Sequence, residues 1–304
     1  MGGVNSSRGF ESLPLRLSGW KRPAPRGSVG RVRESPQQYV LGSDVAELAR
    51  LDHQAAAIAQ PTQMVLRAAG IAPGMRVLDL GTGLGHVALM LAEMVGPSGS
   101  VVAIDQSAAA IEVAAERAAA AGASNVRFAE ADVTTWRDDV AFDAVVGRLV
   151  LFHMADPVAV VRHHLAGLEA AGLMVAVDFD VGASRVDPPT PLATRALGWV
   201  MAAFTHAGAH PSIGPHLAQI FSEAGVGHVR SFGIQGYLDP HDPTAARMLA
   251  GVVRSLHDTI VAAGIAEPAE IGIDTLEQRL AEEAHEANAV LLPPTVACAW
   301  GRRL

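Results

Sequence analysis

The sequence predicts an α/β domain: a doubly wound, mostly parallel sheet of seven strands with helices on both faces. Along residues 75–180, apolar segments of strand length alternate with longer segments of helical periodicity. The strands there are joined by four crossovers, and connections of this length join parallel strands. Hydrophobic residues make up 50% of the 304-residue chain and charged residues 18%, so the chain can bury a large core.

Five strands of the expected sheet lie within residues 75–180, each an apolar run followed by a turn. They are expected at residues 75–80, 101–104, 126–128, 142–147 and 174–177. Helices are expected from the first strand to about residue 94, at residues 107–121 and at residues 156–169. Gly96-Pro97 and Gly122 close the first two helices, because glycine suits the left-handed backbone that follows a helix.

The segments before and after this core are predicted to add helices and two more strands. Residues 43–69 have helical spacing, with Ser43 as N-cap and Pro61 dividing the run into two helices. Towards the C-terminus we expect a helix at residues 213–224, a strand at 229–234, helices at 243–263 and 274–290, and a last strand at 296–300.

Residues 1–36 differ in composition from the rest of the chain. They mix Gly, Ser, Pro and Arg without hydrophobic periodicity, and such a segment buries too little apolar area to fold alone. Residues 1–34 carry a net charge of +5, which leaves −13 on the other 270 residues. We therefore expect a disordered N-terminal extension, residues 1–36, followed by one domain, residues 37–304. Because an acidic domain repels phosphate backbones, we expect no nucleic-acid partner.

Composition also excludes several classes of site. Cys298 is the only cysteine, so neither an internal disulfide framework nor a cysteine zinc site can form. We expect no metal, because no acid or cysteine stands at ligand spacing from His163, His164, His206 or His210. Charged residues and histidines interrupt every apolar run before it reaches the roughly 18 residues of a membrane span. We expect a cytoplasmic protein with no membrane partner.

A glycine-rich turn follows the first expected strand, in the sequence D-L-G-T-G-L-G of residues 79–85. Glycines let a ligand approach the backbone closely, and the helix that follows presents free N–H groups. A dinucleotide fingerprint would need its third glycine at position 86, where the chain has His86. The pattern therefore favours a bound ligand other than a dinucleotide; the alternative is a tight turn without a ligand.

The position of the third glycine, Gly85, and the acid two residues before the first resemble motif I of class I S-adenosylmethionine-dependent methyltransferases. Further matches follow in order: Asp105 after the second strand, residues 129–133 after the third, and F-D-A-V-V of residues 142–146, which resembles motif IV. The resemblance implies a Rossmann-like fold with S-adenosyl-L-methionine as cofactor. The residues that it assigns to cofactor binding are Asp79, Gly81, Thr82, Gly83, Gly85, Asp105, Gln106, Asp132, Val133 and Arg148.

The resemblance gives these residues different roles. It implies that Asp105 accepts hydrogen bonds from both ribose hydroxyls, as in dinucleotide enzymes, although Asp105 could instead be a helix N-cap. It places Asp132 against the adenine amino group, beside the N–H of Val133, although Asp132 could simply face solvent. Arg148 could bind the methionine carboxylate or pair with a surface acid.

Other polar residues have a functional and a structural interpretation. His153, just beyond the fourth strand, is the candidate general base, or else a structural histidine. His86 could point at the methionyl end or lie on a helix face. Arg50 and Gln54 resemble polar positions on a helix that closes over the cofactor, or they belong to its solvated face.

Two segments depart from patterns known in the class. Residues 168–173 resemble the turn L-x-P-G-G into strand five, with Ala171 and Leu173 in place of the proline and the second glycine. Residues 147–150 read G-R-L-V, where methyltransferases of DNA or glutamine amino groups carry [N/D/S]-P-P-[Y/F/W]. The second departure argues against that group.

The predicted reaction is in-line SN2 transfer of a methyl group from S-adenosylmethionine to an O, N or C nucleophile of a small molecule. The sulfonium is already a good leaving group, so the protein mainly aligns the nucleophile, and a base helps only for a phenol, carboxylic acid or protonated amine. We expect lid helices in residues 43–69, a cofactor-binding core in 75–180, and substrate-side insertions in 181–212 and 243–290. The side chains that could line a pocket for a hydrophobic or aromatic molecule, or simply pack on the sheet, are Met201, Phe204, Met248, Val252 and Leu256.

Two other functions are weighed against this one. An NAD(P)-dependent oxidoreductase is disfavoured by the position of the third glycine and because Tyr39 and Tyr237 have no lysine partner in a Tyr-x-x-x-Lys pair. A non-catalytic S-adenosylmethionine-binding protein is left open by the sequence, as is a homodimer.

Overall fold

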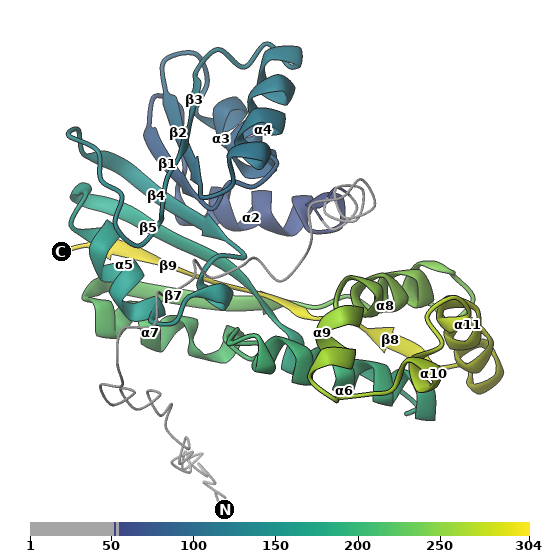
Figure 1. Ribbon diagram of the computed structural model, residues 1–304. Helices are drawn as coiled ribbons and strands as arrows, with labels where there is room; N and C mark the ends of the chain where they lie inside the picture. Colours follow the sequence, from purple (N-terminus) through teal and green to yellow (C-terminus); the bar gives the residue numbers. More distant parts are fainter. Residues whose placement is uncertain (1–51, 53–54) are drawn as a thin grey trace, which may run out of the picture. The chain divides into compact units, whose positions relative to one another are not determined.

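A seven-stranded sheet is the centre of the computed structural model, which describes residue 52 and residues 55–304 (Figure 1). Its strands are β1 (Arg76–Leu80), β2 (Ser100–Asp105), β3 (Val126–Glu130), β4 (Phe142–Arg148), β5 (Leu168–Asp180), β7 (Val226–Ile234) and β9 (Thr295–Arg303). They lie in the order β3-β2-β1-β4-β5-β9-β7, and in this sheet β9 alone runs antiparallel to its neighbours. The predicted fold class, a mostly parallel sheet of seven strands, is confirmed.

Helices cover both faces of the sheet because the central strands are apolar on both sides. Along β1, Val77 packs into one buried cluster and Leu78 into the other. The first cluster is covered by α2 (Ala59–Ala69) and α3 (His86–Val95), with α4 (Ala108–Ala120) beside β2 and β3. The second is covered by α5 (Pro157–Leu165) and α7 (Leu217–Ala224). Figure 1 shows these two layers on either side of the strands.

Helix ends follow local sequence signals. Ser107 Oγ accepts from the N–H of Ala110 at the start of α4, and Asp156 Oδ1 accepts from that of Ala159 at the start of α5. Gly225 ends α7 in the left-handed conformation, as predicted. The run divides as predicted near Pro61: residues 55–57 are helical, Ile58 is a turn, and α2 begins at Ala59, so this proline lies in the first turn of α2, where a missing N–H costs no intrahelical bond.

The connections around β4 differ from the sequence prediction. Residues 131–141, between β3 and β4, form turns rather than a crossover helix. The helix expected at residues 156–169 ends at Leu165, and β5 begins at Leu168 rather than at residue 174. Ala171 lies in an irregularity of β5 with φ 61°, a left-handed backbone that suits glycine. Aligned without a gap from Leu168, the L-x-P-G-G pattern places its proline at Ala170 and its first glycine at Ala171. The assignment of the proline position to Ala171 is therefore wrong.

A second group of elements follows the carboxyl end of β5 (Figure 1). It contains α6 (Pro191–His206), α8 (Thr244–Ser255), α9 (His257–Ala262), α10 (Pro268–Ile271), α11 (Leu276–Ala287) and a two-stranded sheet of β6 (Arg185–Asp187) and β8 (Val290–Leu292). The helix predicted at residues 274–290 ends at Ala287, because Asn288 takes the left-handed conformation and β8 follows. We call α6 and α8–α11 the helical cap.

The edge strand β7 differs from its predicted bounds. β7 begins at Val226, earlier than the predicted residue 229, and a register shift between Gly227 and Arg230 interrupts its pairing with β9. The predictions for residues 1–36, Ser43, Arg50 and Gln54 fall outside the described residues. Among the helices of the described chain, none has the length and apolar character needed to cross a membrane.

Candidate functional site

The carboxyl ends of β2, β1 and β4 bring three charged residues to one edge of the sheet. β1 lies between the other two, with Leu80 paired to Ile104 on one side and to Gly147 on the other. The chain leaves β1 for β2, so the gap between β1 and β4 is a topological switch point, where ligands bind in open α/β sheets. The residues on the α3 face at this edge are Asp79, Asp105 and Arg148, since the strand register places them on the same side.

The glycine-rich turn after β1 needs its glycines for two different reasons. Gly81, Gly83 and Gly85 have φ of 61°, 51° and 82°, a region that favours glycine. A Cβ on Gly81 would lie 2.7 Å from Val150 Cγ2, whereas a Cβ on Gly83 would meet no atom of the described residues within 4 Å. The N–H of Thr82 donates to the carbonyl of Ile104 at 2.9 Å and ties the turn to β2. Gly83 therefore faces open space, while Gly81 is closed off by the segment after β4.

Asp105 holds the same turn from the neighbouring strand. Its Oδ2 accepts from the N–H of Gly83 at 2.8 Å, and its Oδ1 accepts from that of Ser107 at 3.0 Å. Ser107, not Asp105, is the N-cap of α4, so the helix-cap alternative for Asp105 is wrong. Each carboxylate oxygen keeps a second lone pair for a ligand. Gln106 beside it is exposed.

Asp79 is buried and Arg148 is partly buried, and their opposite charges act on each other. Asp79 is 1% exposed, and burial raises its pKa to about 7, while the guanidinium of Arg148 acts in the opposite direction. Burial lowers the pKa of Arg148, and Asp79 opposes that shift. In the described structure Asp79 Oδ2 and Arg148 Nη1 are buried without a hydrogen-bond partner. The charge that acts on Arg148 is thus a buried acid rather than a surface one, and both groups have unused hydrogen-bonding capacity.

Asp132 and Val133 follow β3, on the far side of β2. Asp132 is exposed, and its Oδ1 accepts from the N–H and the hydroxyl of Thr134, both at 2.7 Å. Val133 is buried, and its carbonyl accepts from Nε2 of His164 at 2.7 Å. The side chain of Asp132 thus hydrogen-bonds within its own loop. The adenine contact of Asp132 and Val133 stays a prediction.

His86 lies on the first turn of α3 in a charged contact. Its Nε2 is 2.9 Å from Asp52 Oδ1, and both carboxylate oxygens of Asp52 accept from the guanidinium of Arg117 at 2.8 and 2.9 Å. Burial lowers the pKa of His86, and the nearby Arg117 lowers it further. This arrangement favours the helix-face interpretation of His86. The contact also joins Asp52, from the segment before α2, to the start of α3.

His153 ends a single turn of 3-10 helix, η1 (Leu151–His153), directly after β4. Its ring lies 4.9 Å from that of Phe152 in an edge-on arrangement. Burial lowers the pKa of His153 to about 4, so its imidazole is neutral near pH 7. A neutral imidazole at this edge is able to accept a proton.

Asp178 is a buried acid that sequence reasoning missed. It lies near the end of β5 with no exposed surface, and burial raises its pKa to about 8. Its Oδ1 accepts from the N–H of Phe152 at 3.3 Å. The predicted strand ends at Val177, one residue before this acid; an acid directly after an apolar run at the carboxyl edge was the available signal.

Three of the four histidines that the sequence excludes as metal ligands hydrogen-bond to backbone carbonyl groups. Nε2 atoms of His163, His164 and His210 lie 2.7 to 2.9 Å from carbonyl oxygens. Within residues 52 and 55–304, no three His, Cys, Asp or Glu side chains gather so as to hold a metal ion. The expectation of no metal stays a prediction.

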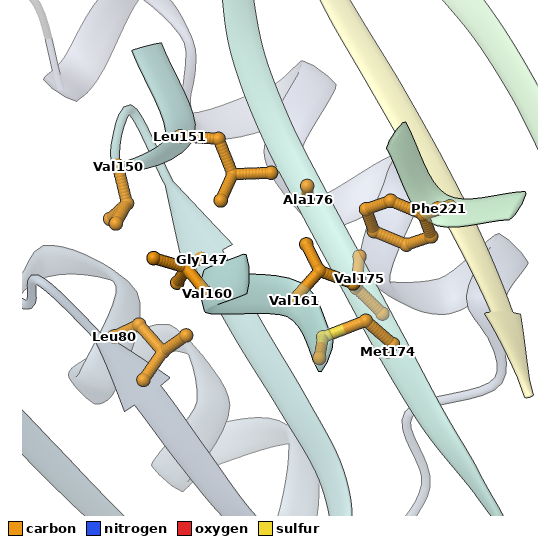
Figure 2. Close-up of a pocket in the computed structure, with 10 residues that line it drawn as sticks. All are labelled: Leu80, Gly147, Val150, Leu151, Val160, Val161, Met174, Val175, Ala176 and Phe221. Atoms are coloured by element: carbon orange, nitrogen blue, oxygen red, sulfur yellow. The ribbon is translucent and has the colours of Figure 1, made fainter. Parts of the chain in front are cut away.

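An apolar pocket lies beneath the switch point and is distinct from the charged edge (Figure 2). Ten side chains or backbones line it, all without a polar side-chain group: Leu80, Gly147, Val150, Leu151, Val160, Val161, Met174, Val175, Ala176 and Phe221. It lies between β4, β5, α5 and α7, as a gap in the core. A pocket with no polar group cannot orient or activate a nucleophile.

The strand order, the glycine turn at the switch point and the acid at the end of β2 define a Rossmann-like methyltransferase fold. Residues 71–206 match the family described as "Methyltransferase domain". Residues 71–206 therefore form a class I S-adenosylmethionine-dependent methyltransferase domain.

Comparisons with individual proteins agree on this domain and differ in acceptor. A tRNA (guanine(6)-N2)-methyltransferase of Thermus thermophilus is 40% identical over 118 residues, 37% of this chain and 34% of that protein. A ubiquinone/menaquinone biosynthesis C-methyltransferase of Ectopseudomonas mendocina is 30% identical over 119 residues, 38% of this chain and 46% of that protein. The chain thus matches less than half the length of these relatives.

A solved structure extends the likeness of fold over more of the chain. A phosphoethanolamine-type N-methyltransferase of Haemonchus contortus, solved with phosphomonomethylethanolamine and S-adenosylhomocysteine, has a TM-score of 0.52 at 16% identity. The match covers 80% of this chain and 52% of that one. At this identity the likeness concerns the fold alone.

Proposed function

We propose that this protein moves a methyl group from S-adenosylmethionine to an O, N or C nucleophile of a small molecule by in-line displacement. The observation that carries the proposal is the open space over Gly83 in the described structure, together with two charged side chains at the same edge of the sheet, each with a buried atom that lacks a hydrogen-bond partner: Asp79 Oδ2 and Arg148 Nη1. A buried polar atom without a hydrogen-bond partner costs folding free energy, so we expect each of these two atoms to bind a ligand group of opposite charge. An amino acid carries both charges.

The site residues fit the parts of S-adenosylmethionine. Arg148 Nη1 would hold the carboxylate of the methionine end, and Asp79 Oδ2 its ammonium group, which would also favour the ionised form of Asp79. Asp105 would accept from the ribose hydroxyls, with Gln106 beside it, and Asp132 and the N–H of Val133 would meet adenine. The turn formed by Gly81, Thr82, Gly83 and Gly85 would lie against the cofactor backbone.

What the cofactor supplies is a methyl group on a sulfonium, already activated for displacement. The chain then has to orient the acceptor and exclude water. We assign His153 the acceptance of a proton from a phenol hydroxyl as its oxygen is methylated, since the imidazole is neutral near pH 7. With a pKa of about 4 it is a weak base, so it serves best where transfer itself acidifies the acceptor proton.

The choice of a small-molecule acceptor rests on charge and on the helical cap. Residues 35–304 carry a net charge of −13, which opposes a phosphate backbone. In the cap, Phe204 and Leu256 are buried in the core, so these two pack as structural residues. Three other side chains of the cap are only partly buried, which makes them candidates to contact a hydrophobic or aromatic acceptor: Met201, Met248 and Val252. An RNA acceptor is the second candidate, favoured by the tRNA-modifying relative.

The test is a transfer assay with S-adenosylmethionine labelled in the methyl group. The protein is incubated with a panel of phenols, amines and indoles, and separately with bulk tRNA and ribosomal RNA. Label in a small-molecule product supports the proposal. Label in RNA alone would replace the acceptor class, and cofactor binding without transfer to any acceptor would favour the non-catalytic alternative.

A further inference from the structure

Asp178 lies on the opposite face of the sheet from the proposed cofactor site. Val177 pairs with Arg148 and packs into the cluster under α2 and α3, whereas Ala176 packs into the cluster under α5 and α7. Because side chains alternate along a strand, Asp178 shares the face of Ala176. It is fully buried there, and within the described structure its Oδ2 has no hydrogen-bond partner. The mechanism proposed above does not use it.

What Asp178 contacts is the turn that carries the candidate base. Its Oδ1 accepts from the N–H of Phe152, the middle residue of η1, at 3.3 Å. Just before that turn, Leu149 takes a φ of 58°, and its N–H donates to the carbonyl of Val177 at 2.8 Å. The end of β5 therefore holds the chain on both sides of the bend that leads from β4 into η1.

The segment after α6 holds the same turn through His210. The N–H of His210 donates to the carbonyl of Phe152 at 2.8 Å, and His210 Nε2 lies 2.9 Å from the carbonyl of Met154. The ring of Phe152 meets that of Phe204 edge-on at 5.0 Å. Attached from the sheet by Asp178 and from the segment after α6 by His210, η1 is held on two sides.

The place of η1 matters because it adjoins the glycine turn. Val150, the residue before η1, occupies the space that a Cβ on Gly81 would need, at 2.7 Å. At its other end η1 presents His153 at the carboxyl edge of β4. A shift of η1 would therefore move both the wall of the glycine turn and the candidate base.

We propose that Asp178 is a positioning residue for methyl transfer, which fixes η1 and thereby holds Val150 against the glycine turn and His153 at the carboxyl edge of β4. An apolar side chain here would avoid burying a carboxyl group, so the benefit of the acid lies in the backbone N–H that it binds. The inference rests on the proposed function for its catalytic meaning, although the contact itself does not depend on it.

The first test compares three variants by hydrogen exchange and by the titration of His153. In Asp178→Ala, the peptide that spans residues 149–155 exchanges about tenfold faster, because a hydrogen bond to a carboxyl group is lost. In the same variant the pKa of His153 moves from about 4 towards its ordinary 6.5 as the turn opens to water. Asp178→Asn, which keeps the acceptor oxygen, behaves like the wild type in both measurements.

A matched control separates positioning from general stability. Val177→Ala removes buried volume from the neighbouring residue and leaves the backbone bonds of η1 in place. It should lower the free energy of unfolding without opening the 149–155 peptide selectively. If Asp178→Ala fails to fold, the Phe152 amide of the wild-type protein decides by its exchange rate in NMR: it must be protected. Rapid exchange of that amide, or equal behaviour of the Ala and Asn variants, would overturn the proposal.

Calorimetry and kinetics then connect the contact to function. Asp178→Ala should raise the Kd for S-adenosylmethionine by less than the fall in kcat, because the acid lies on the other face of the sheet and acts on the glycine turn only through Val150. With the acceptor identified by the labelled assay, its kcat should fall at least about tenfold, by a larger factor than the change in KM for S-adenosylmethionine. An unchanged kcat overturns the positioning role. A wild-type protein that binds no S-adenosylmethionine sinks the proposed function instead, while the exchange result still stands.

Discussion

Replacing Gly83 by alanine tests whether the space above the glycine turn is a binding site. The residue has φ 51°, so an alanine there costs about 1 kcal/mol in backbone strain, and its Cβ would touch no atom of the part of the chain that the structure describes. Gly122, after the far end of α4, has φ 68° and the same empty surroundings. Gly83→Ala and Gly122→Ala should therefore lose the same stability, about 2–4 °C in Tm for a domain of this size.

The two variants should differ in cofactor binding. A methyl group that intrudes on a bound ligand costs about 1–3 kcal/mol, which raises the Kd for S-adenosylmethionine about 5- to 150-fold. We expect that increase for Gly83→Ala and an unchanged Kd for Gly122→Ala, both measured by isothermal titration calorimetry. Equal Kd values in the two variants would refute the placement of the ligand over Gly83. Gly81→Ala should instead lose more stability than either, since Val150 leaves no room for its Cβ.

Three further predictions concern other residues. Arg148→Met should raise the Kd for S-adenosylmethionine about 10- to 150-fold and leave that for 5′-methylthioadenosine, which lacks the amino acid end, unchanged; calorimetry with both ligands checks this. Glu283→Ala should lower the free energy of unfolding in urea by about 1–2 kcal/mol, with Glu283→Gln less affected, because this carboxylate accepts from the N–H groups of Leu192 and Ala193 at the start of α6. Burial raises the pKa of Asp178 from 3.8 to about 8, so its contribution to stability is complete below pH 4 and is lost as the pH rises to 8. Asp178→Asn should therefore flatten the fall in stability between pH 6.5 and 8 by up to about 1.4 kcal/mol per pH unit, and an identical slope in urea titrations of both proteins would contradict the assignment.

The core of the fold was predictable because its signals are local. The runs around Val77 and Val102 are apolar on both faces, as central parallel strands are, and helices between them begin and end at capping residues. The glycine turn could be placed for the same reason. The different surroundings of Gly81 and Gly83 could not be predicted. Gly81 contacts Val150, which lies 69 positions further along the chain, whereas Gly83 faces open space in the described structure.

The parts that escaped prediction depend on tertiary contacts. The three-residue strands β6 and β8 are too short to show alternation, and they pair with each other across about a hundred residues of chain. α6 was missed as an element although Pro191 stands at its first turn, because its buried positions pack against elements distant in the chain, among them α8, α9 and α11. Asp178 was missed because an acid normally ends an apolar strand, whereas here β5 continues past it in pairing with β9.

The central claim is that the switch point between β1 and β4 binds S-adenosylmethionine. Isothermal titration calorimetry of the wild-type protein with S-adenosylmethionine, S-adenosylhomocysteine and NAD tests it most directly. We predict saturable binding of the first two at one site per chain and no binding of NAD. Binding of NAD alone would contradict the account and favour the oxidoreductase alternative.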